Sequence, residues 1–171
     1  LEISPFMVTL AMQTLTRGLT MMITDGSRIV VKNQAFNWLG GGQWNLGGFI
    51  VPHVSLVLVI VVAAALFWMR NFSMGIKLYA VGGNKTAAYA SGIPVKFQVF
   101  QTYFISGLLC GLAAIITIGR SGSAQPLAGN GLEFDVITAV VMGGVSLLGG
   151  VGTMAGIFLG ALLLGVLTLG I

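Results

Sequence analysis

Three long runs without any formally charged side chain constrain this 171-residue chain more than any other feature. The runs are Ile50–Met69, Phe97–Ile118 and Gly152–Ile171. An α-helix rises about 1.5 Å per residue, so about 20 residues cross a hydrocarbon core of about 30 Å. Because lipid offers the backbone no hydrogen-bond partner, each run is predicted to be a membrane-spanning helix.

The scarcity of charge in the whole chain supports the same solvent. Charged residues make up 7% of the chain, 56% is hydrophobic, and the mean hydropathy is +0.99. Ordinary soluble domains carry about 25% charged residues, so a soluble enzyme and a disordered chain are both excluded. One cysteine, Cys110, and one histidine, His53, exclude an internal disulfide and make a metal cluster unexpected. The basic residues form no dense patch, so no nucleic-acid partner is expected. No metal or cofactor is expected either.

Two further apolar segments are less regular. Ser4–Thr24 contains Arg17 followed by Gly18, and an arginine at bilayer depth costs roughly 2.5–3.5 kcal/mol on insertion scales. This segment is therefore either a broken helix or a helix that faces a protein-lined cavity. Glu133–Leu148 is short for a full crossing and is followed by glycines, which indicates a half-length or re-entrant helix beside a hinge. The predicted fold class is all-α, a polytopic transmembrane helical bundle with a broken or re-entrant helix.

The charges of the loops predict their orientation. The stretch 70–96 carries four basic residues and no acid: Arg70, Lys77, Lys85 and Lys96. The stretches 25–49 and 119–135 carry two and one basic residues. Because basic residues are enriched in cytoplasmic loops, the loop 70–96 is predicted to be cytoplasmic and the other two to lie outside.

The cytoplasmic loop carries the signature of a short helix. Asn84 can cap it, Lys85–Ser91 can form two turns, Gly92 suits a left-handed end, and Pro94 prevents continuation. Two turns cannot cross a membrane, so this is either an ordinary structured loop or a helix that docks on a cytosolic partner. The neighbouring sequence Gly-Gly-Asn-Lys-Thr fails the phosphate-loop pattern, so an ATPase would have to be a separate chain or domain.

Many of the 26 glycines are spaced for helix packing. Glycines spaced four residues apart leave one face of a helix without side chains, and such a face lets helix backbones approach closely in lipid. The predicted packing residues are Gly107 and Gly111 in one span and Gly152, Gly156 and Gly160 in the last. Such faces suit either rigid packing or a surface that slides during a transport cycle.

Polar and aromatic residues gather in the two outer segments, before the second span and before the short helix at 133–148. Such groups suit a hydroxyl-rich ligand, but they equally suit a membrane interface, where Trp is enriched. The candidate residues for a substrate pathway are Gln125, Glu133 and Asp135. Asn130 and Glu133 also have capping-box spacing, which gives them a structural role. His53 is interpreted as an interfacial residue, because no acid lies four residues away to partner it.

Several longer motifs resemble one family. They are Gly75–Pro94, Gly122–Pro126, Gly131–Asp135 and Ala139–Gly152, with a weaker match at Pro5–Leu10 and Arg17–Leu19. These motifs are similar, in matching order, to those of bacterial ABC permeases for ribose and related monosaccharides. The resemblance covers nearly all of the chain.

The resemblance implies a longer permease, of which residues 1–171 would be part of one transmembrane domain truncated at both ends. It implies a transport subunit of the bacterial inner membrane, not an enzyme, working as a homodimer or heterodimer with a cytosolic ATP-binding subunit and a periplasmic sugar-binding protein. The short cytoplasmic helix would then be a coupling helix to the ATPase. The residues assigned to this coupling are Gly83, Asn84, Ala87, Ala88, Ser91 and Gly92. The alternative is a secondary transporter or channel without an ATPase partner.

Overall fold

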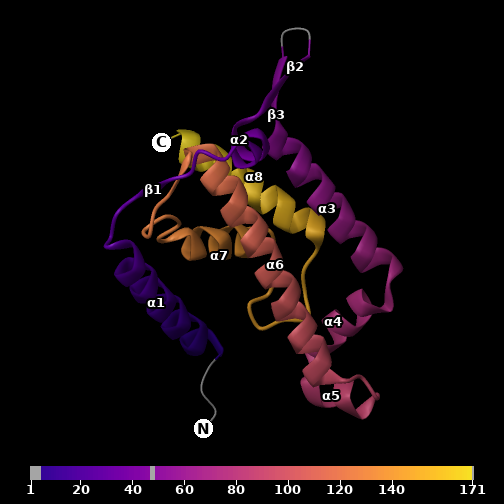
Figure 1. The fold of residues 1–171 in the computed structure, drawn as a ribbon. Coiled ribbons are helices and arrows are strands. Elements are labelled where there is room, and N and C mark those ends of the chain that lie inside the picture. The colour runs from indigo at the N-terminus through magenta and orange to yellow at the C-terminus, as the bar shows by residue number, and fades with distance from the viewer. Residues whose placement is uncertain (1–4, 47–48, 171) are drawn as a thin grey trace. The chain divides into compact units, whose positions relative to one another are not determined.

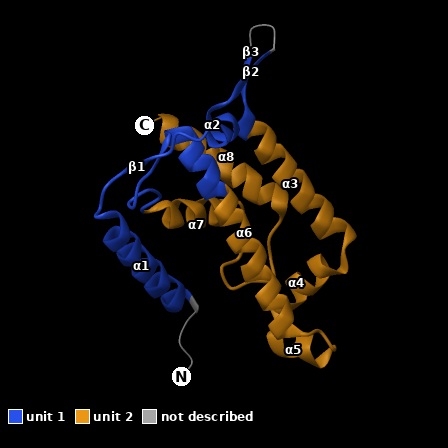
Figure 2. Cartoon of the chain, in the orientation of Figure 1, with its two compact units in different colours: residues 1–54, 113–130 blue, residues 55–112, 131–171 orange. Residues whose placement is uncertain are grey.

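The computed structural model of the chain describes residues 5–46 and 49–170, which are mostly helical (Figure 1). The helices are α1 (Pro5–Thr24), α2 (Gln34–Gly41), α3 (His53–Asn71), α4 (Ser73–Gly83), α5 (Lys85–Ala90), α6 (Val95–Ser121), α7 (Leu132–Met142) and α8 (Met154–Gly170). The strands are β1 (Ile29–Val30), β2 (Gln43–Leu46), β3 (Phe49–Pro52) and β4 (Ser123–Ala124). The chain forms two compact units (Figure 2): residues 1–54 with 113–130, and residues 55–112 with 131–171.

Two helices have the length and composition of membrane spans. Helix α3 has 19 residues and α6 has 27, and an apolar stretch of 18 residues within each has a mean hydropathy of 2.1 in α3 and 1.9 in α6. Only 6% of the apolar window of α3, and none of that of α6, is buried within the chain. A soluble core helix would be covered, so these exposed apolar surfaces fit lipid or further helices. Helix α8 is apolar as well, with 17 residues.

The span predicted at Ile50–Met69 begins later in the structure than the sequence indicated. Residues 50–52 belong to β3, which pairs antiparallel with β2 and places Ile50 opposite Asn45 and Val51 opposite Trp44. The β-branched side chains of Ile50 and Val51 favour a strand, and Pro52 has no N–H to donate to a helix or a ladder. The helix therefore starts at His53, directly after the hairpin.

The mostly helical fold agrees with the prediction, but short strands that the sequence did not predict are also present. In addition to β2 and β3, strand β1 pairs antiparallel with β4, with Ile29 opposite Ala124 and Val30 opposite Ser123. Strands of two to four residues are too short to produce a recognisable alternation in the sequence. Both ladders lie in the first unit.

Helix α1 is continuous through Arg17 and Gly18, so the broken-helix alternative is wrong. A single glycine in a helix costs about 1 kcal/mol relative to alanine but does not interrupt the hydrogen-bond ladder. The hydroxyls of Thr14, Thr16 and Thr20 donate to carbonyls four residues earlier, at 3.0, 2.7 and 2.9 Å. These polar groups are therefore satisfied within the helix itself.

Helix α7 has 11 residues, about half the length that a hydrocarbon core requires. It begins after Gly131, whose φ of +87° is accessible to glycine, and Gly131 makes no side-chain cap. The predicted capping box is therefore wrong. The side chain of Asn130 accepts a hydrogen bond from Arg17 instead. That α7 is a re-entrant element stays a prediction.

In the first unit, α2 lies against the end of α6 through two glycines. A Cβ on Gly40 would stand 2.5 Å from the backbone nitrogen of Arg120. A Cβ on Gly119 would meet the carbonyl of Phe36. The two backbones therefore touch directly, which only glycine permits at these positions.

Candidate functional site

Helix α5 is joined to α4 through a single residue, Asn84. The backbone N–H of Asn84 donates to the carbonyl of Ala80 at 3.1 Å, and this bond closes α4. Its carbonyl accepts from the N–H of Ala88 at 2.9 Å, and its side-chain Oδ1 accepts from the N–H of Ala87 at 3.0 Å. The predicted cap at Asn84 is thus present, and the same residue is bonded to both helices.

The far end of α5 is closed by Gly92. Its φ is +77°, a conformation that glycine adopts without steric cost. The N–H of Gly92 donates to the carbonyl of Tyr89 and that of Ile93 to the carbonyl of Ala88, both at 3.0 Å. These bonds satisfy the last carbonyls of the helix, and Pro94 follows them.

The residues assigned to coupling do not share one environment. Gly83, Asn84, Ala87, Ser91 and Gly92 are exposed, whereas Ala88 is only 3% exposed. Ala88 therefore lies on the face of α5 that packs within the second unit, and a partner could reach only the other face. The largest side chain on that open face is Tyr89, 76% exposed. The sequence reasoning missed it, although an aromatic residue amid small ones is a recognisable signal for an interface.

The end of α4 lies against a segment that we call the connecting loop, residues 143–153, which joins α7 to α8. A Cβ on Gly82 would stand 2.6 Å from the backbone nitrogen of Gly150. A Cβ on Gly149 would stand 2.6 Å from the carbonyl oxygen of Gly82, and one on Gly150 would stand 2.6 Å from the Cα of Gly83. We call this approach of Gly82 and Gly83 to Gly149 and Gly150 the glycine contact. It brings backbone against backbone with no side chain between.

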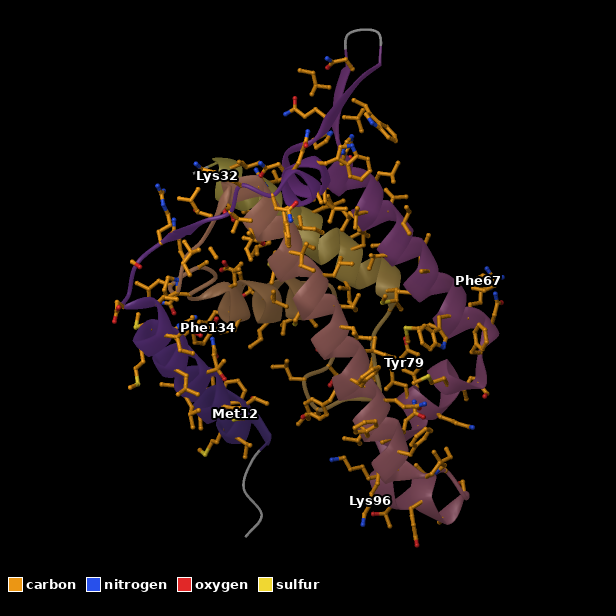
Figure 3. The ribbon with its side chains drawn as sticks, viewed as in Figure 1. Met12, Lys32, Phe67, Tyr79, Lys96 and Phe134 are labelled. Carbon is orange, nitrogen blue, oxygen red and sulfur yellow. The ribbon has the colours of Figure 1, made fainter. Side chains whose placement is uncertain are left out.

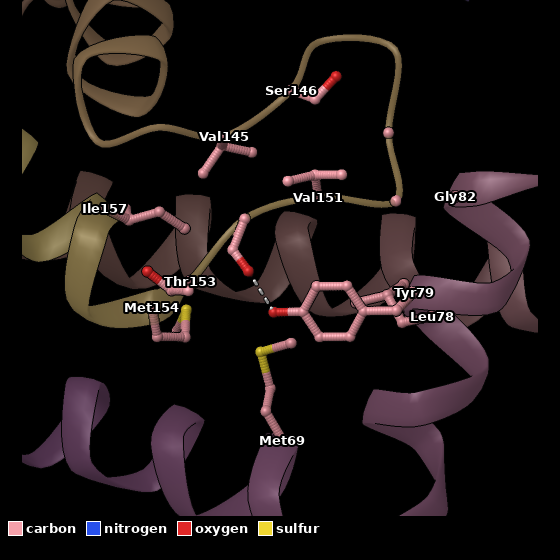
Figure 4. Close-up of a pocket in the computed structure, with 13 residues that line it drawn as sticks. Met69, Leu78, Tyr79, Gly82, Val145, Ser146, Val151, Thr153, Met154 and Ile157 are labelled. Carbon is pink, nitrogen blue, oxygen red and sulfur yellow. Dashed lines mark hydrogen bonds between the residues drawn. The ribbon is translucent and has the colours of Figure 1, made fainter.

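A second bond joins the same two elements. Tyr79 of α4 points toward the connecting loop (Figure 4), and its hydroxyl donates to the carbonyl of Gly152 at 2.7 Å. Figure 3 also labels Tyr79, together with Lys96 in the first turn of α6. Helix α4 is thus attached to the loop at two points one turn apart.

A cavity of about 370 Å³ lies beside these contacts. It is bounded by Met69, by α4 and by the connecting loop, with Met154 and Ile157 of α8 (Figure 4). Its lining is almost wholly apolar, and the Tyr79 hydroxyl is already used. A sugar needs several hydrogen-bond partners, so this cavity does not suit one.

Two of the predicted packing glycines lie between α7 and α8. A Cβ on Gly156 would meet the carbonyl of Gly143, and one on Gly160 would meet the carbonyl of Ala139. Gly152, in contrast, precedes α8 and lies in the connecting loop, so its assignment to the same helix face is wrong. Around Gly107 and Gly111 of α6, no atom of another described element lies within 4 Å of the point where a Cβ would stand. Packing at these two glycines stays a prediction.

The candidate residues of a substrate pathway divide between the two units. Gln125 is exposed and belongs to the first unit. Glu133 is half-buried and Asp135 exposed, both in the first turn of α7 in the second unit. Carboxylates in that position are stabilised by the amino end of the helix, so α7 accounts for them in part.

Arg17, which the sequence left without a role, has a partner. Its Nη1 donates to Oδ1 of Asn130 at 2.6 Å within the first unit. A charged donor in an apolar helix is thereby satisfied by a neutral amide. This face of α1 therefore contacts protein at Asn130, and a protein-lined cavity around Arg17 stays a prediction.

His53 is 9% exposed and packs against two indole rings. The ring centroids lie 4.8 Å from that of Trp38 and 5.1 Å from that of Trp44. Its Nδ1 lies 2.7 Å from the carbonyl of Trp38. A carbonyl only accepts, so Nδ1 carries the proton. Sequence reasoning placed His53 at an interface and missed this aromatic packing.

Comparison with known proteins gives consistent matches. Residues 1–171 match the family model described as branched-chain amino acid transport system / permease component. The chain is similar to the ribose import permease protein RbsC of Escherichia coli (strain K12), with 42% identity over 99% of this chain and 53% of the relative. RbsC of Bacillus subtilis (strain 168) is 41% identical over 99% of this chain and 52% of the relative.

A permease named for another sugar matches as well. The L-arabinose ABC transporter permease protein AraH of Azospirillum brasilense is 36% identical over 96% of this chain and 47% of the relative. The chain thus spans about half the length of the curated relatives that it matches. No solved structure matches it.

Proposed function

The chain belongs to the family of branched-chain amino acid transport system permease components, and on this premise we propose that it is part of the permease subunit of an ATP-driven importer for ribose or a related monosaccharide. The observation that carries the proposal is the identity of about 40% over nearly the whole chain to permeases named for ribose import. The relatives are named for ribose and for L-arabinose, two five-carbon sugars that differ only in the configuration of their hydroxyl-bearing carbons, so the class of sugar is proposed here and the individual sugar is not.

The membrane is the proposed site of action. The exposed apolar surfaces of α3 and α6 support it, because in water they would drive aggregation. We assign the protein to the bacterial inner membrane as part of one multi-pass transmembrane domain. The basic residues Arg70, Lys77, Lys85 and Lys96 favour a cytoplasmic position for the stretch 70–96.

We assign the coupling to the ATPase to α5. The support is its geometry: it is capped at both ends, it is fixed to the unit by the buried Ala88, and it exposes the ring of Tyr89. A ring of this size can fill a pocket on a partner protein and exclude water from it. Gly83 and Asn84 then hold the helix at its junction with α4, and Ser91 and Gly92 close its other end.

Three partners follow from this assignment. A cytosolic ATP-binding subunit supplies hydrolysis, since the Gly-Gly-Asn-Lys-Thr segment lacks the phosphate-loop pattern. A periplasmic sugar-binding protein delivers the solute, and a second permease copy forms the other side of the pathway. Transport proceeds by alternating access, in which the ATPase favours one of two conformations of the permease.

The solute pathway is proposed to include Gln125, Glu133 and Asp135. An amide and two carboxylates offer the acceptors and donors that sugar hydroxyls need. Their exposure is compatible with contact to a solute. Replacement of each by a non-polar residue of similar size is expected to raise the KM of uptake.

The test is uptake in a strain that lacks the gene for the full-length protein. The strain is supplied with the wild-type gene, and import of radiolabelled ribose and arabinose is measured with an active and with a hydrolysis-deficient ATP-binding partner. We expect one of these sugars to be imported only when the partner hydrolyses ATP. Uptake that persists without hydrolysis would support a secondary transporter or channel instead. Uptake of neither sugar would refute the assignment to ribose or a related monosaccharide.

A further inference from the structure

We propose that the glycine contact and the Tyr79 hydroxyl carry the displacement of α5 to α7 and α8, which makes Tyr79 and Gly82 positioning residues for transport; the inference rests on the proposed coupling role of α5. All the elements concerned lie in the second unit. The opposing possibility is that α5 acts on α6, which follows it in the chain after residues 91–94.

The first step is the junction between α5 and α4. Asn84 separates the two helices and is hydrogen-bonded to both, through its N–H, its carbonyl and its Oδ1. No flexible linker therefore lies between them. A force on the exposed face of α5 reaches the last turn of α4 with little loss to bending.

The second step is the glycine contact at that last turn. The backbone of Gly82 lies directly against Gly149 and Gly150. Packed interiors have low compressibility, and here no rotatable side chain lies between the two backbones to absorb a shift. Movement of the end of α4 must therefore displace the connecting loop.

The third step is the bond from Tyr79 to Gly152. Pushing can be transmitted by contact alone, but pulling requires an attachment. The hydroxyl of Tyr79 donates to the carbonyl of Gly152 at 2.7 Å, one turn before the glycine contact. The two points of attachment together prevent α4 from separating from the loop or rotating against it.

The fourth step is the loop itself, which is closed by its own hydrogen bonds. The N–H of Ser146 donates to the carbonyl of Val151 at 3.0 Å, and that of Gly149 to the carbonyl of Ser146 at 3.1 Å. The loop therefore moves as one piece and is continuous with α7 and α8. These two helices touch through Gly156 and Gly160, so they follow together.

The cavity beside the contact gives this movement space. Met69 and Met154 face it together with Val151 (Figure 4). Methionine side chains adapt to changes in the shape of a packed region. The loop can thus shift without a collision that would resist it.

The experiment uses the full-length permease assembled with its ATP-binding and sugar-binding partners in proteoliposomes. The readout is the number of ATP molecules hydrolysed per sugar imported, together with the amount of complex recovered. Tyr79→Phe removes only the donor to Gly152, and Tyr103→Phe removes an exposed hydroxyl of α6 as its control. Gly82→Ala inserts a methyl against the Gly150 backbone, and Gly165→Ala, with open space around it, is its control.

We expect Tyr79→Phe to raise the ratio of ATP to sugar about three- to tenfold, the equilibrium effect of one neutral hydrogen bond, and Gly82→Ala to raise it further. Complex recovery and basal hydrolysis should stay near wild type, whereas a purely structural defect would lower both. The two controls should match wild type. If Gly82→Ala does not accumulate, Tyr79→Phe decides the question alone.

Tyr89→Ala, on the open face of α5, separates the coupling role of α5 from the proposed route through the connecting loop. If Tyr89→Ala uncouples hydrolysis from uptake while Tyr79→Phe and Gly82→Ala behave as wild type, the route through the connecting loop is refuted and the coupling role of α5 stands. If Tyr89→Ala has no effect on the ratio, the coupling role of α5 is refuted, and the inference falls with it.

Discussion

The side chain of Asn84 offers a direct test of whether a formed α5 is needed for coupling. In Asn84→Ala the two backbone hydrogen bonds of residue 84, to Ala80 and from Ala88, can remain. Only the bond from the Ala87 N–H to Oδ1 is lost. The change therefore acts on the first turn of α5 and leaves the end of α4 intact.

The size of the effect follows from that one bond. Loss of an N-cap side chain costs about 1 kcal/mol, and about 1 kcal/mol changes an equilibrium about fivefold. Helix α5 has six residues, far below the length of about 12 residues at which an isolated helix becomes even marginally stable. The cap is therefore a large part of what keeps α5 helical, and we expect ATP hydrolysed per sugar imported to rise about fivefold.

The assay compares Asn84→Ala with Asn84→Ser in proteoliposomes that contain the complete transporter. Serine caps a helix about as well as asparagine, so Asn84→Ser should retain the wild-type ratio. Complex recovery, measured by co-purification with the ATP-binding partner, separates uncoupling from loss of docking. An equal ratio in the alanine and serine variants would refute the reasoning that the cap controls coupling.

Three further predictions concern other parts of the chain. Asn130→Ala should lower the stability of the full-length protein to thermal unfolding in detergent by about 1.5–3 kcal/mol, the contribution of a hydrogen bond from a charged donor. Asn130→Asp should preserve or raise this stability, because it keeps an acceptor for Arg17. Gly160→Ala should cost about 1–3 kcal/mol, since its methyl meets the backbone of α7, and a melting curve no different from that of wild type would contradict the packing of α7 on α8. Thr86→Cys in a Cys110→Ala background should react with a membrane-impermeant maleimide only in inside-out vesicles; labelling in intact cells would overturn the cytoplasmic position of α5.

Local signals in the sequence predicted local structure well. The cap at Asn84 and the left-handed Gly92 follow from residue chemistry over a few positions, and both are present in the structure. The apolar runs likewise predicted α3 and α6, because length and hydropathy alone decide whether a helix can span. The predicted ends of the helices were less accurate. Helix α3 begins at His53 and not at Ile50, because residues 50–52 pair with β2 in a hairpin.

Contacts between distant segments could not be predicted. Nothing near Arg17 in the sequence points to Asn130, 113 positions away, so the same asparagine was interpreted as a helix cap. Gly82 and Gly149 were likewise read separately, one in a loop motif and one as part of a hinge, although their backbones touch. A glycine signals that space is needed but not which segment fills that space.

Ala88 and Tyr89 give helix α5 one buried face and one exposed face. A docking helix must present a face to its partner and hold itself to its own protein by the opposite face. Ala88 is a small, buried residue, so the inner face of α5 can pack closely against the rest of the second unit. Tyr89 follows it in the sequence, and the helical pitch directs its side chain about 100° away from that of Ala88. Because the anchor and the contact are adjacent on a helix of six residues, α5 cannot be displaced at Tyr89 without moving Ala88, and the unit to which Ala88 is packed must follow.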